Sequence, residues 1–192
     1  MGRRPLFDKD HILAAALEVL AEHGPGAVTI QAVAQKSGAP TGSIYHRFDS
    51  RNVMLAGLWL RVVENFQKGF ITAIDKDDGL SAALHTPRWV RKHLMEGRIL
   101  LLYRREQLIK GAWPNDVKDC IESLAREINQ AIHGFTQRNF DESNSQSLER
   151  TVFTLIDVPR AAVMRYLELG IIPPPSVDQL IRETYYTIFG RE

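Results

Sequence analysis

The segment 29–51 holds two short helical patterns separated by a glycine, and it constrains the fold more than any other part of the chain. Thr29 can cap the first helix, because a hydroxyl oxygen accepts an otherwise unpaired backbone N–H. Gly38 can end it, because glycine enters the left-handed conformation of a sharp turn without steric cost. Pro40 suits the first position of a second helix over residues 40–48. The segment therefore predicts a helix-turn-helix, which presents its second helix to the major groove of DNA.

The predicted second helix turns Ile44 and Phe48 inward and carries small polar and aromatic side chains at its exposed end. Taken singly, Tyr45 and His46 have ordinary explanations as a half-buried aromatic residue and a surface histidine. Gly42 costs about 1 kcal/mol relative to alanine in a helix. A glycine there suggests close approach of another backbone, for which a DNA phosphate is the natural candidate. Together these residues predict a surface that reads DNA.

A helix upstream of this segment completes a three-helix unit. It begins at Asp8 or Asp10, and the sequence Gly-Pro-Gly at 24–26 ends it. Its apolar stripe consists of Ile12, Leu13, Ala16, Leu17 and Leu20. Val28 and Ile30 are expected to pack beneath this stripe.

Residues 8–55 resemble the DNA-binding domain of TetR-family transcriptional regulators, through the segments ALEVLAEHG, VTIQAVAQKSG and APTGSIYHRFDSR. The order glycine, small residue, aliphatic residue, Tyr, His and Phe is specific to that family. The resemblance covers about the first quarter of the chain, and the rest agrees in length and helical character. It implies an all-α protein of about nine helices. Residues 1–50 would form the helix-turn-helix domain, and residues 51–192 the effector-binding and dimerisation domain.

The resemblance also implies which residues contact DNA. The predicted set is Thr29, Gln31, Thr41, Gly42, Ser43, Tyr45, His46, Arg47 and Arg51. Gln31 and Thr41 are the predicted base contacts, and Tyr45 and His46 mainly position the helix. Arg47 and Arg51 are predicted to bind phosphates. Members of the family often have a lysine where Arg51 stands, so the positive charge is kept.

Net charge supports DNA binding only weakly. Residues 1–51 contain six Lys and Arg residues against five Asp and Glu residues, whereas a strongly basic patch is the usual footprint of nucleic-acid binding. The basic surface must therefore be local, with Lys36, Arg47 and Arg51 flanking the reading helix. The sequence Gly-Arg-Arg-Pro at 2–5 could reach phosphates or a minor groove, or could serve as a solubilising terminus. We expect modest non-specific affinity.

Composition indicates an ordinary globular protein in the cytoplasm. The chain is 44% hydrophobic and 24% charged, its apolar runs are too short for a membrane span, and its first residues lack a secretion signal. The lone Cys120 excludes an internal disulfide and fits a reducing compartment. Its position beside Ile121 in a helical pattern predicts a small core residue.

Beyond residue 50 the chain shows helical patterns with few strand signals. A long connector helix is predicted over 51–74. Further helices are predicted over about 80–93, 96–110, 114–139, 145–169 and 176–189. Pro159 should kink the penultimate helix, because proline removes a hydrogen bond and crowds the preceding turn.

The last two predicted helices carry apolar stripes that could form a dimer interface or the domain's own core. The stripes are Val152, Leu155, Ile156, Val163, Met164 and Leu167, followed by Leu180, Ile181, Tyr185, Ile188 and Phe189. TetR-like proteins typically dimerise through a four-helix bundle made from these two helices, so the resemblance favours the interface. A two-fold dimer implies double-stranded DNA with a palindromic operator as its partner.

The resemblance further implies a small-molecule pocket in the middle of the chain, for an effector that the sequence does not identify. Aromatic and polar residues mingled on apolar helices are the candidates: Trp89, His93, Tyr103, Gln107, Trp113, Phe135 and Phe153. Core packing is the alternative for each of them. The cations of RWVRKH and YRRE could favour an acidic ligand, and surface solvation explains them equally well.

These observations predict a homodimeric repressor released from a palindromic operator by the effector. An activator or ligand-independent regulator of the same fold, and a helical protein-interaction module, remain alternatives. The sequence has no glycine-rich phosphate loop, no nucleophile elbow and no histidine pair at zinc-binding spacing. We therefore expect no enzymatic activity, no cofactor and no metal site.

Overall fold

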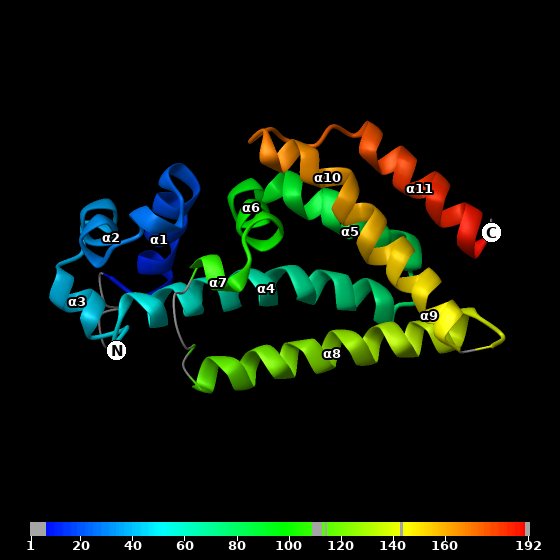
Figure 1. Cartoon of the computed structure of the whole chain (residues 1–192), viewed down its shortest axis with the longest axis horizontal. Helices are drawn as coiled ribbons and strands as arrows, with labels where there is room; N and C mark the ends of the chain where they lie inside the picture. The colour runs from blue at the N-terminus through cyan, green and yellow to red at the C-terminus, as the bar shows by residue number, and fades with distance from the viewer. Residues whose placement is uncertain (1–6, 109–112, 114, 143, 191–192) are drawn as a thin grey trace, which may run out of the picture. The chain divides into compact units, whose positions relative to one another are not determined.

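A computed structural model describes residues 7–108, 113, 115–142 and 144–190, and within these ranges every regular element is helical (Figure 1). The elements are α1 (Lys9–His23), η1 (Pro25–Ala27), α2 (Ile30–Ser37), α3 (Thr41–Tyr45), α4 (Arg51–Asp75), α5 (Gly79–Lys92), α6 (Leu94–Leu102), α7 (Arg105–Leu108), α8 (Asn115–Asn139), α9 (Ser145–Val152), η2 (Phe153–Asp157), α10 (Val158–Glu168) and α11 (Ser176–Phe189). The predicted all-α fold is confirmed.

Two of the predicted helices are each divided in the structure. The one predicted over 96–110 ends at Leu102, and α7 starts at Arg105. Gln107 accepts a hydrogen bond from the backbone N–H of Arg104 at 2.7 Å, which caps the new helix. The predicted end of that helix at residue 110 and the predicted start of the next at Pro114 lie outside the described residues.

The helix predicted over 145–169 is interrupted by η2, a single π-helical turn that ends at Asp157, two residues before Pro159. Proline has no N–H to donate and its ring crowds the preceding turn, so the wider π turn accommodates it. A π turn therefore separates α9 from α10 just before Pro159.

The chain forms two compact units. The first comprises Met1–Val62 and Tyr103–Cys120, and the second comprises Val63–Leu102 and Ile121–Glu192. The division lies within α4, after Val62, whereas the predicted domain boundary lies after residue 50. Helix α4 thus contributes residues to both units.

The first unit is built on the buried faces of α1, α2, α3 and the first turns of α4. Its fully or almost fully buried apolar side chains include Ile12, Ala16, Leu20, Val28, Val33, Ile44, Met54, Leu55 and Leu58. Asp8 caps α1 by accepting from the backbone N–H of His11 at 2.9 Å.

Cys120 is exposed, so the prediction of a core cysteine is wrong. A polar-faced helix such as α8 offers few inward positions, and Cys120 does not occupy one.

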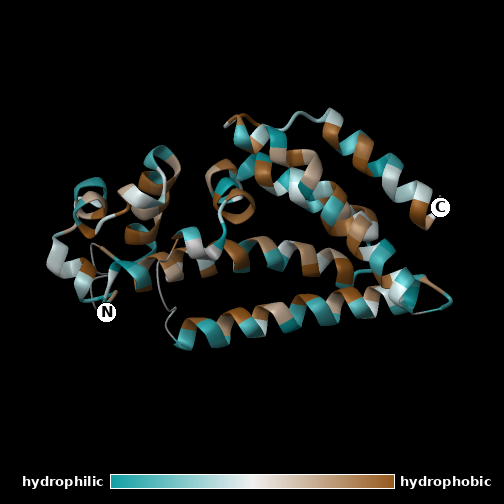
Figure 2. Ribbon diagram, in the orientation of Figure 1, coloured by the Kyte–Doolittle hydropathy of each residue, from teal (hydrophilic) through white to brown (hydrophobic). Residues whose placement is uncertain are grey.

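In the second unit, α5 packs against α6, η2, α10 and α11. The core side chains come from all of these helices and from α4 and α8: Phe70, Ile74, Leu84, Val90, Ile99, Phe135, Leu155, Val163, Leu167 and Ile181. Hydrophobic and hydrophilic residues alternate along α8 at helical spacing, so one stripe of this helix is apolar (Figure 2).

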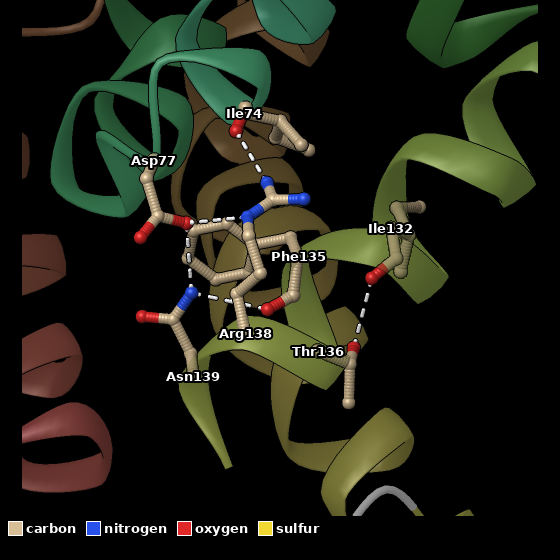
Figure 3. Close-up of polar contacts among 7 residues, drawn as sticks. All are labelled: Ile74, Asp77, Ile132, Phe135, Thr136, Arg138 and Asn139. Atoms are coloured by element: carbon tan, nitrogen blue, oxygen red, sulfur yellow. Dashed lines mark hydrogen bonds and ion pairs between the residues drawn. The ribbon is translucent and has the colours of Figure 1, made fainter.

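The turn between α4 and α5 is fixed by side chains from α8 (Figure 3). Asp77 adopts a left-handed conformation, with φ of 58°. Its carboxylate accepts from Arg138 Nε at 3.1 Å and from Asn139 Nδ2 at 2.9 Å. Arg138 Nη2 also donates to the carbonyl of Ile74 at 3.0 Å. These contacts satisfy a carbonyl at the end of α4 and join α8 to the turn.

Candidate DNA-binding surface and effector site

The turn between α2 and α3 has the predicted helix-turn-helix geometry. Thr29 Oγ1 accepts from the backbone N–H of Ala32 at 3.0 Å, and Gly38 adopts the left-handed conformation, with φ of 70°. Ser37 Oγ accepts from the backbone N–H of Ala39 at 3.2 Å and braces the turn. Pro40 precedes the helix with a ψ of 140°, so its predicted place as the first helical residue is wrong by one position. An extended ψ lets the chain change direction before α3 begins.

Helix α3 is shorter than predicted, but its inner side is as expected. It ends at Tyr45, and the backbone continues in turns as His46 N–H donates to Gly42 O and Phe48 N–H donates to Ile44 O. Ile44 is fully buried and Phe48 is almost so. These two apolar side chains fix which face of α3 remains outside.

The outer face of α3 consists of residues that the sequence predicted to read DNA. Thr41, Gly42, Tyr45 and His46 are exposed, and 55% of the Tyr45 surface is accessible. Ser43 is half-buried. A Cβ added at Gly42 would stand in open space. No described neighbour therefore requires glycine at this position, as expected where an external backbone approaches. Thr29 and Gln31, at the start of α2, are exposed as well.

The two predicted phosphate-binding arginines also make contacts within their own unit. Arg47 Nη1 donates to the carbonyl of Ser43 at 2.9 Å. Arg51 donates from Nε to the carbonyl of Val28 and from Nη2 to that of Pro25 at 2.6 Å, which joins the start of α4 to η1. This structural role of Arg51 was not predicted from the sequence. One signal was available, since a cation in the first turn of a helix opposes the helix dipole and needs a specific acceptor.

Lys36, which was predicted to flank the reading helix, is paired with acids of its own unit. Its ammonium lies 3.1 Å from carboxylate oxygens of both Glu18 and Glu22 on α1. These hydrogen bonds raise the pKa of Lys36, so it stays charged while its charge is offset by the two acids. It joins α2 to α1 within the first unit.

The seven predicted pocket residues are divided between the two units. Tyr103, Gln107 and Trp113 belong to the first, and Trp89, His93, Phe135 and Phe153 to the second. In the first, Trp113 packs edge-on against Trp59, with ring centroids 5.7 Å apart. These seven residues were predicted as one set, because nothing in the helical periodicity of the sequence marks the break at 103–104.

Trp89 and His93 belong to a cluster of rings in the second unit that also includes Phe66 and His85. Trp89 stacks on His93, with centroids 4.9 Å apart, and meets Phe66 edge-on at 5.2 Å. His85 contacts Phe66 at 4.9 Å. The sequence analysis did not single out Phe66 or His85. The signal was helical spacing, since His85, Trp89 and His93 follow one another at intervals of four.

His85 is held firmly within this cluster. Its Nε2 donates to the backbone carbonyl of Phe66 at 2.8 Å. Burial lowers the pKa of His85 below its ordinary value of 6.5, so the ring is neutral at neutral pH. A Cβ added at Gly69 would lie 2.4 Å from Cε1 of His85, so a glycine is required beneath the ring.

Two other predicted pocket residues lie in different surroundings. Phe135 is fully buried and packs against Phe189, with centroids 5.8 Å apart, so it is a core residue. Phe153, in η2, is 50% exposed.

A groove of about 350 Å³ lies along α4 and α8, lined by Glu64, Gln67, Lys68, Ile71, Thr72, Leu124 and Glu127. Gln67, which is buried, crosses from α4 to α8 and donates to the carbonyl of Leu124 at 2.6 Å.

The predicted dimer stripes separate into buried and accessible residues. Leu155, Val163, Leu167 and Ile181 are fully buried within the chain, so their assignment to a dimer interface is wrong. They form core because α5 packs against η2, α10 and α11. Leu180 is 58% exposed. The remaining members are half-buried: Val152, Ile156, Met164, Tyr185, Ile188 and Phe189.

The residues that the structure describes were also compared with the requirements of a membrane span and of a metal site. No helix there is both long and apolar enough to cross a membrane. No three His, Cys, Asp or Glu side chains gather there as they would around a metal ion.

Residues 12–58 match the bacterial regulatory proteins of the tetR family. No curated protein sequence matches the chain. Among solved structures, a TetR transcription regulator from Haloarcula marismortui matches with a TM-score of 0.70 and 17% identity, over 94% of this chain and 97% of that one.

Two similar structures contain ligands. The transcriptional regulator FadR from Bacillus subtilis, in complex with stearoyl-CoA, matches with a TM-score of 0.69 and 15% identity, over 96% of this chain and 100% of that one. The SmeT–triclosan complex matches with a TM-score of 0.63 and 15% identity, over 93% and 90%. At these identities the likeness shows a shared fold. Together with the match over residues 12–58, it shows that the chain has the fold of TetR-family regulators and that its N-terminal segment matches the tetR family of bacterial regulatory proteins.

Proposed function

We propose that the protein is a homodimeric repressor that binds a palindromic operator and is released from it by a small-molecule effector. The observation that carries the proposal is the outer face of α3. Thr41, Gly42, Tyr45 and His46 are exposed there, while Ile44 and Phe48 anchor the opposite side. A short helix with a fixed inner side and an open polar face suits insertion into the major groove.

Within that face the proposed roles follow from chemistry and exposure. Gln31 and Thr41 are exposed and can form hydrogen bonds with base edges. Tyr45 offers a hydroxyl to a phosphate and a ring to a thymine methyl group, and His46 helps to position the helix. Arg47 and Arg51 keep guanidinium N–H groups beyond those used internally, and these would bind phosphates.

Dimerisation is proposed through the accessible members of the C-terminal stripes. Leu180 on α11 is 58% exposed and so is open to contact with a second copy. Ile156, Met164 and Ile188 are half-buried and would be covered by a second copy. A two-fold dimer places two copies of α3 about one DNA turn apart, roughly 34–36 Å, or at a related longer separation.

Effector binding is proposed in the second unit, where Trp89 and His93 lie in the ring cluster. The structural relatives with stearoyl-CoA and with triclosan support a ligand with a large apolar part. Helix α4 belongs to both units, so a ligand that favours another position of α4 can change DNA affinity. A 100-fold preference of the effector for the released state corresponds to about 2.7 kcal/mol of coupling.

The test is selection of random double-stranded DNA by the purified full-length protein, at low salt and after removal of any bound ligand by unfolding and refolding. We expect enrichment of a palindrome with two half-sites. Tyr45→Ala should lose this DNA while sedimenting as the same dimer. A folded, dimeric, ligand-stripped protein that enriches no sequence would contradict the proposal and would favour a protein-interaction module. An effector that tightens DNA binding would reverse the sign of regulation.

A further inference from the structure

The indole N–H of Trp89 has no hydrogen-bond partner although it is buried. The residue is 7% exposed, and Nε1 is the one buried side-chain nitrogen or oxygen without a partner among the residues that the structure describes. The indole N–H can only donate. A buried donor without an acceptor costs free energy, because its hydrogen bond to water is lost and not replaced. Such a group in a native protein calls for a specific explanation.

The rings around Trp89 offer this donor little. Phe66 meets the indole edge-on, with an interplanar angle of 86°, and an aromatic face is a weak acceptor. His93 stacks on the indole at an interplanar angle of 26°, so the two rings lie face to face and not in a hydrogen bond. A buried water needs two to four polar partners, and an apolar ring environment of this kind supplies few.

The ring that stacks on Trp89, His93, reaches the protein surface. Its side chain is 35% exposed, and its Nδ1 lies 3.6 Å from the carboxylate of Glu96. The indole therefore lies beneath a ring that itself reaches the surface. His93 thus covers one face of the indole and is itself partly open to solvent.

The surroundings also restrict the chemical class of a partner. His85 contacts Phe66 and Phe70, and its burial keeps it neutral, so His85 adds aromatic surface and no charge to the ring cluster. An apolar body fits against these rings. The indole N–H requires an acceptor atom.

We propose that Trp89 Nε1 is the hydrogen-bond donor that recognises the effector, and that the effector is an apolar molecule carrying an acceptor oxygen such as a carbonyl. The inference rests on the proposed effector-dependent regulation and adds the atom and the ligand class. Phe66 and His93 supply contact surface for the apolar body. The N–H supplies selectivity, because a hydrocarbon of the same shape leaves it unpaired.

The experiment uses two matched pairs of probes, in which a carbonyl oxygen is replaced by a methyl group. They are 2-acetylnaphthalene with 2-isopropylnaphthalene, and dodecan-2-one with 2-methyldodecane. The three tryptophans give three indole N–H resonances in the ¹⁵N-labelled full-length protein. Trp89→Phe identifies one of them by its loss. Trp59→Phe is the matched control, with the same change in the first unit.

In at least one pair we expect the ketone to bind about tenfold more tightly than the hydrocarbon. The Trp89 resonance should move downfield with the ketone, as expected on hydrogen bonding. Trp89→Phe should lose the tenfold preference, and Trp59→Phe should keep it. The proposal is overturned if both members of each pair bind equally, if Trp89→Phe keeps the preference, if the Trp89 resonance does not respond, or if neither pair binds.

DNA selection separates this inference from the proposed function. Trp89 is not a predicted DNA contact, so Trp89→Phe should enrich the same operator as the unmodified protein. If the protein enriches an operator but its preference for ketones does not depend on Trp89, only the role assigned to Trp89 is contradicted. Absence of enrichment in the unmodified protein would remove the proposed function itself.

Discussion

Two glycines inside helices show how the DNA-reading surface differs from the interior of the second unit. Gly42, in α3, faces open space, and nothing in the described structure requires it. Gly69, in α4, lies so close beneath the His85 ring that a Cβ would be 2.4 Å from Cε1. The same residue type thus leaves room for an external molecule in one region and for an internal side chain in the other. Only neighbours distant in sequence distinguish the two cases.

Alanine substitutions at the adjacent residues Ile44 and Tyr45 should differ most in their effects on stability. Ile44 is fully buried, so Ile44→Ala should destabilise the protein by about 2–5 kcal/mol through lost burial and a cavity. Tyr45 is 55% exposed, so Tyr45→Ala should change stability by less than about 0.5 kcal/mol while it weakens operator binding. Urea unfolding and a DNA titration measure the two effects. If Tyr45→Ala left DNA affinity unchanged at every salt concentration, we would withdraw its assigned contact.

Alanine at the two glycines tests the opening comparison directly. Gly69→Ala should cost about 1–3 kcal/mol, because the His85 ring must move and its hydrogen bond to Phe66 is strained. Gly42→Ala should leave stability unchanged or raise it by up to about 1 kcal/mol, because alanine favours the helix. It should nevertheless weaken operator binding. Equal stability changes in thermal unfolding at the two positions would contradict the comparison.

Acidification should destabilise the interior through His85. Burial lowers its pKa in the folded state below the ordinary 6.5, so the unfolded state binds the proton more readily. Stability should therefore be fully present above pH 6.5 and fall as the pH drops through 6.5 and below, by at most about 1.4 kcal/mol per pH unit from this group. The slope in urea unfolding between pH 7.5 and 5 should be smaller in His85→Gln.

The smallest expected effect distinguishes two cations of the first unit. Arg47→Ala should reduce the slope of log affinity against log salt by about one, because one phosphate contact is lost. Lys36→Ala should leave that slope unchanged, because the ammonium is already paired with Glu18 and Glu22. Operator titrations at four salt concentrations measure both slopes. A reduced slope in Lys36→Ala would place that lysine at the DNA.

The amino-acid sequence determined the elements whose causes are local. The Thr29 cap, the left-handed Gly38, and the inward Ile44 and Phe48 each follow from residues within one turn, and the structure confirms them. The last helix, predicted over 176–189, has those bounds as α11. Helix periodicity and capping act over three or four residues, so they can be read from the chain itself.

The tertiary structure alone decided which apolar residues are buried within the chain. It also decided which charged residues already have partners inside the protein. Leu155, Val163, Leu167 and Ile181 share their spacing with accessible neighbours, and only packing around α5 places them in the core. Arg51 binds carbonyls of η1, and Lys36 binds acids of α1. The unpaired N–H of Trp89 is likewise a property of its surroundings. Burial and pairing depend on residues far away in the sequence, which local periodicity does not specify.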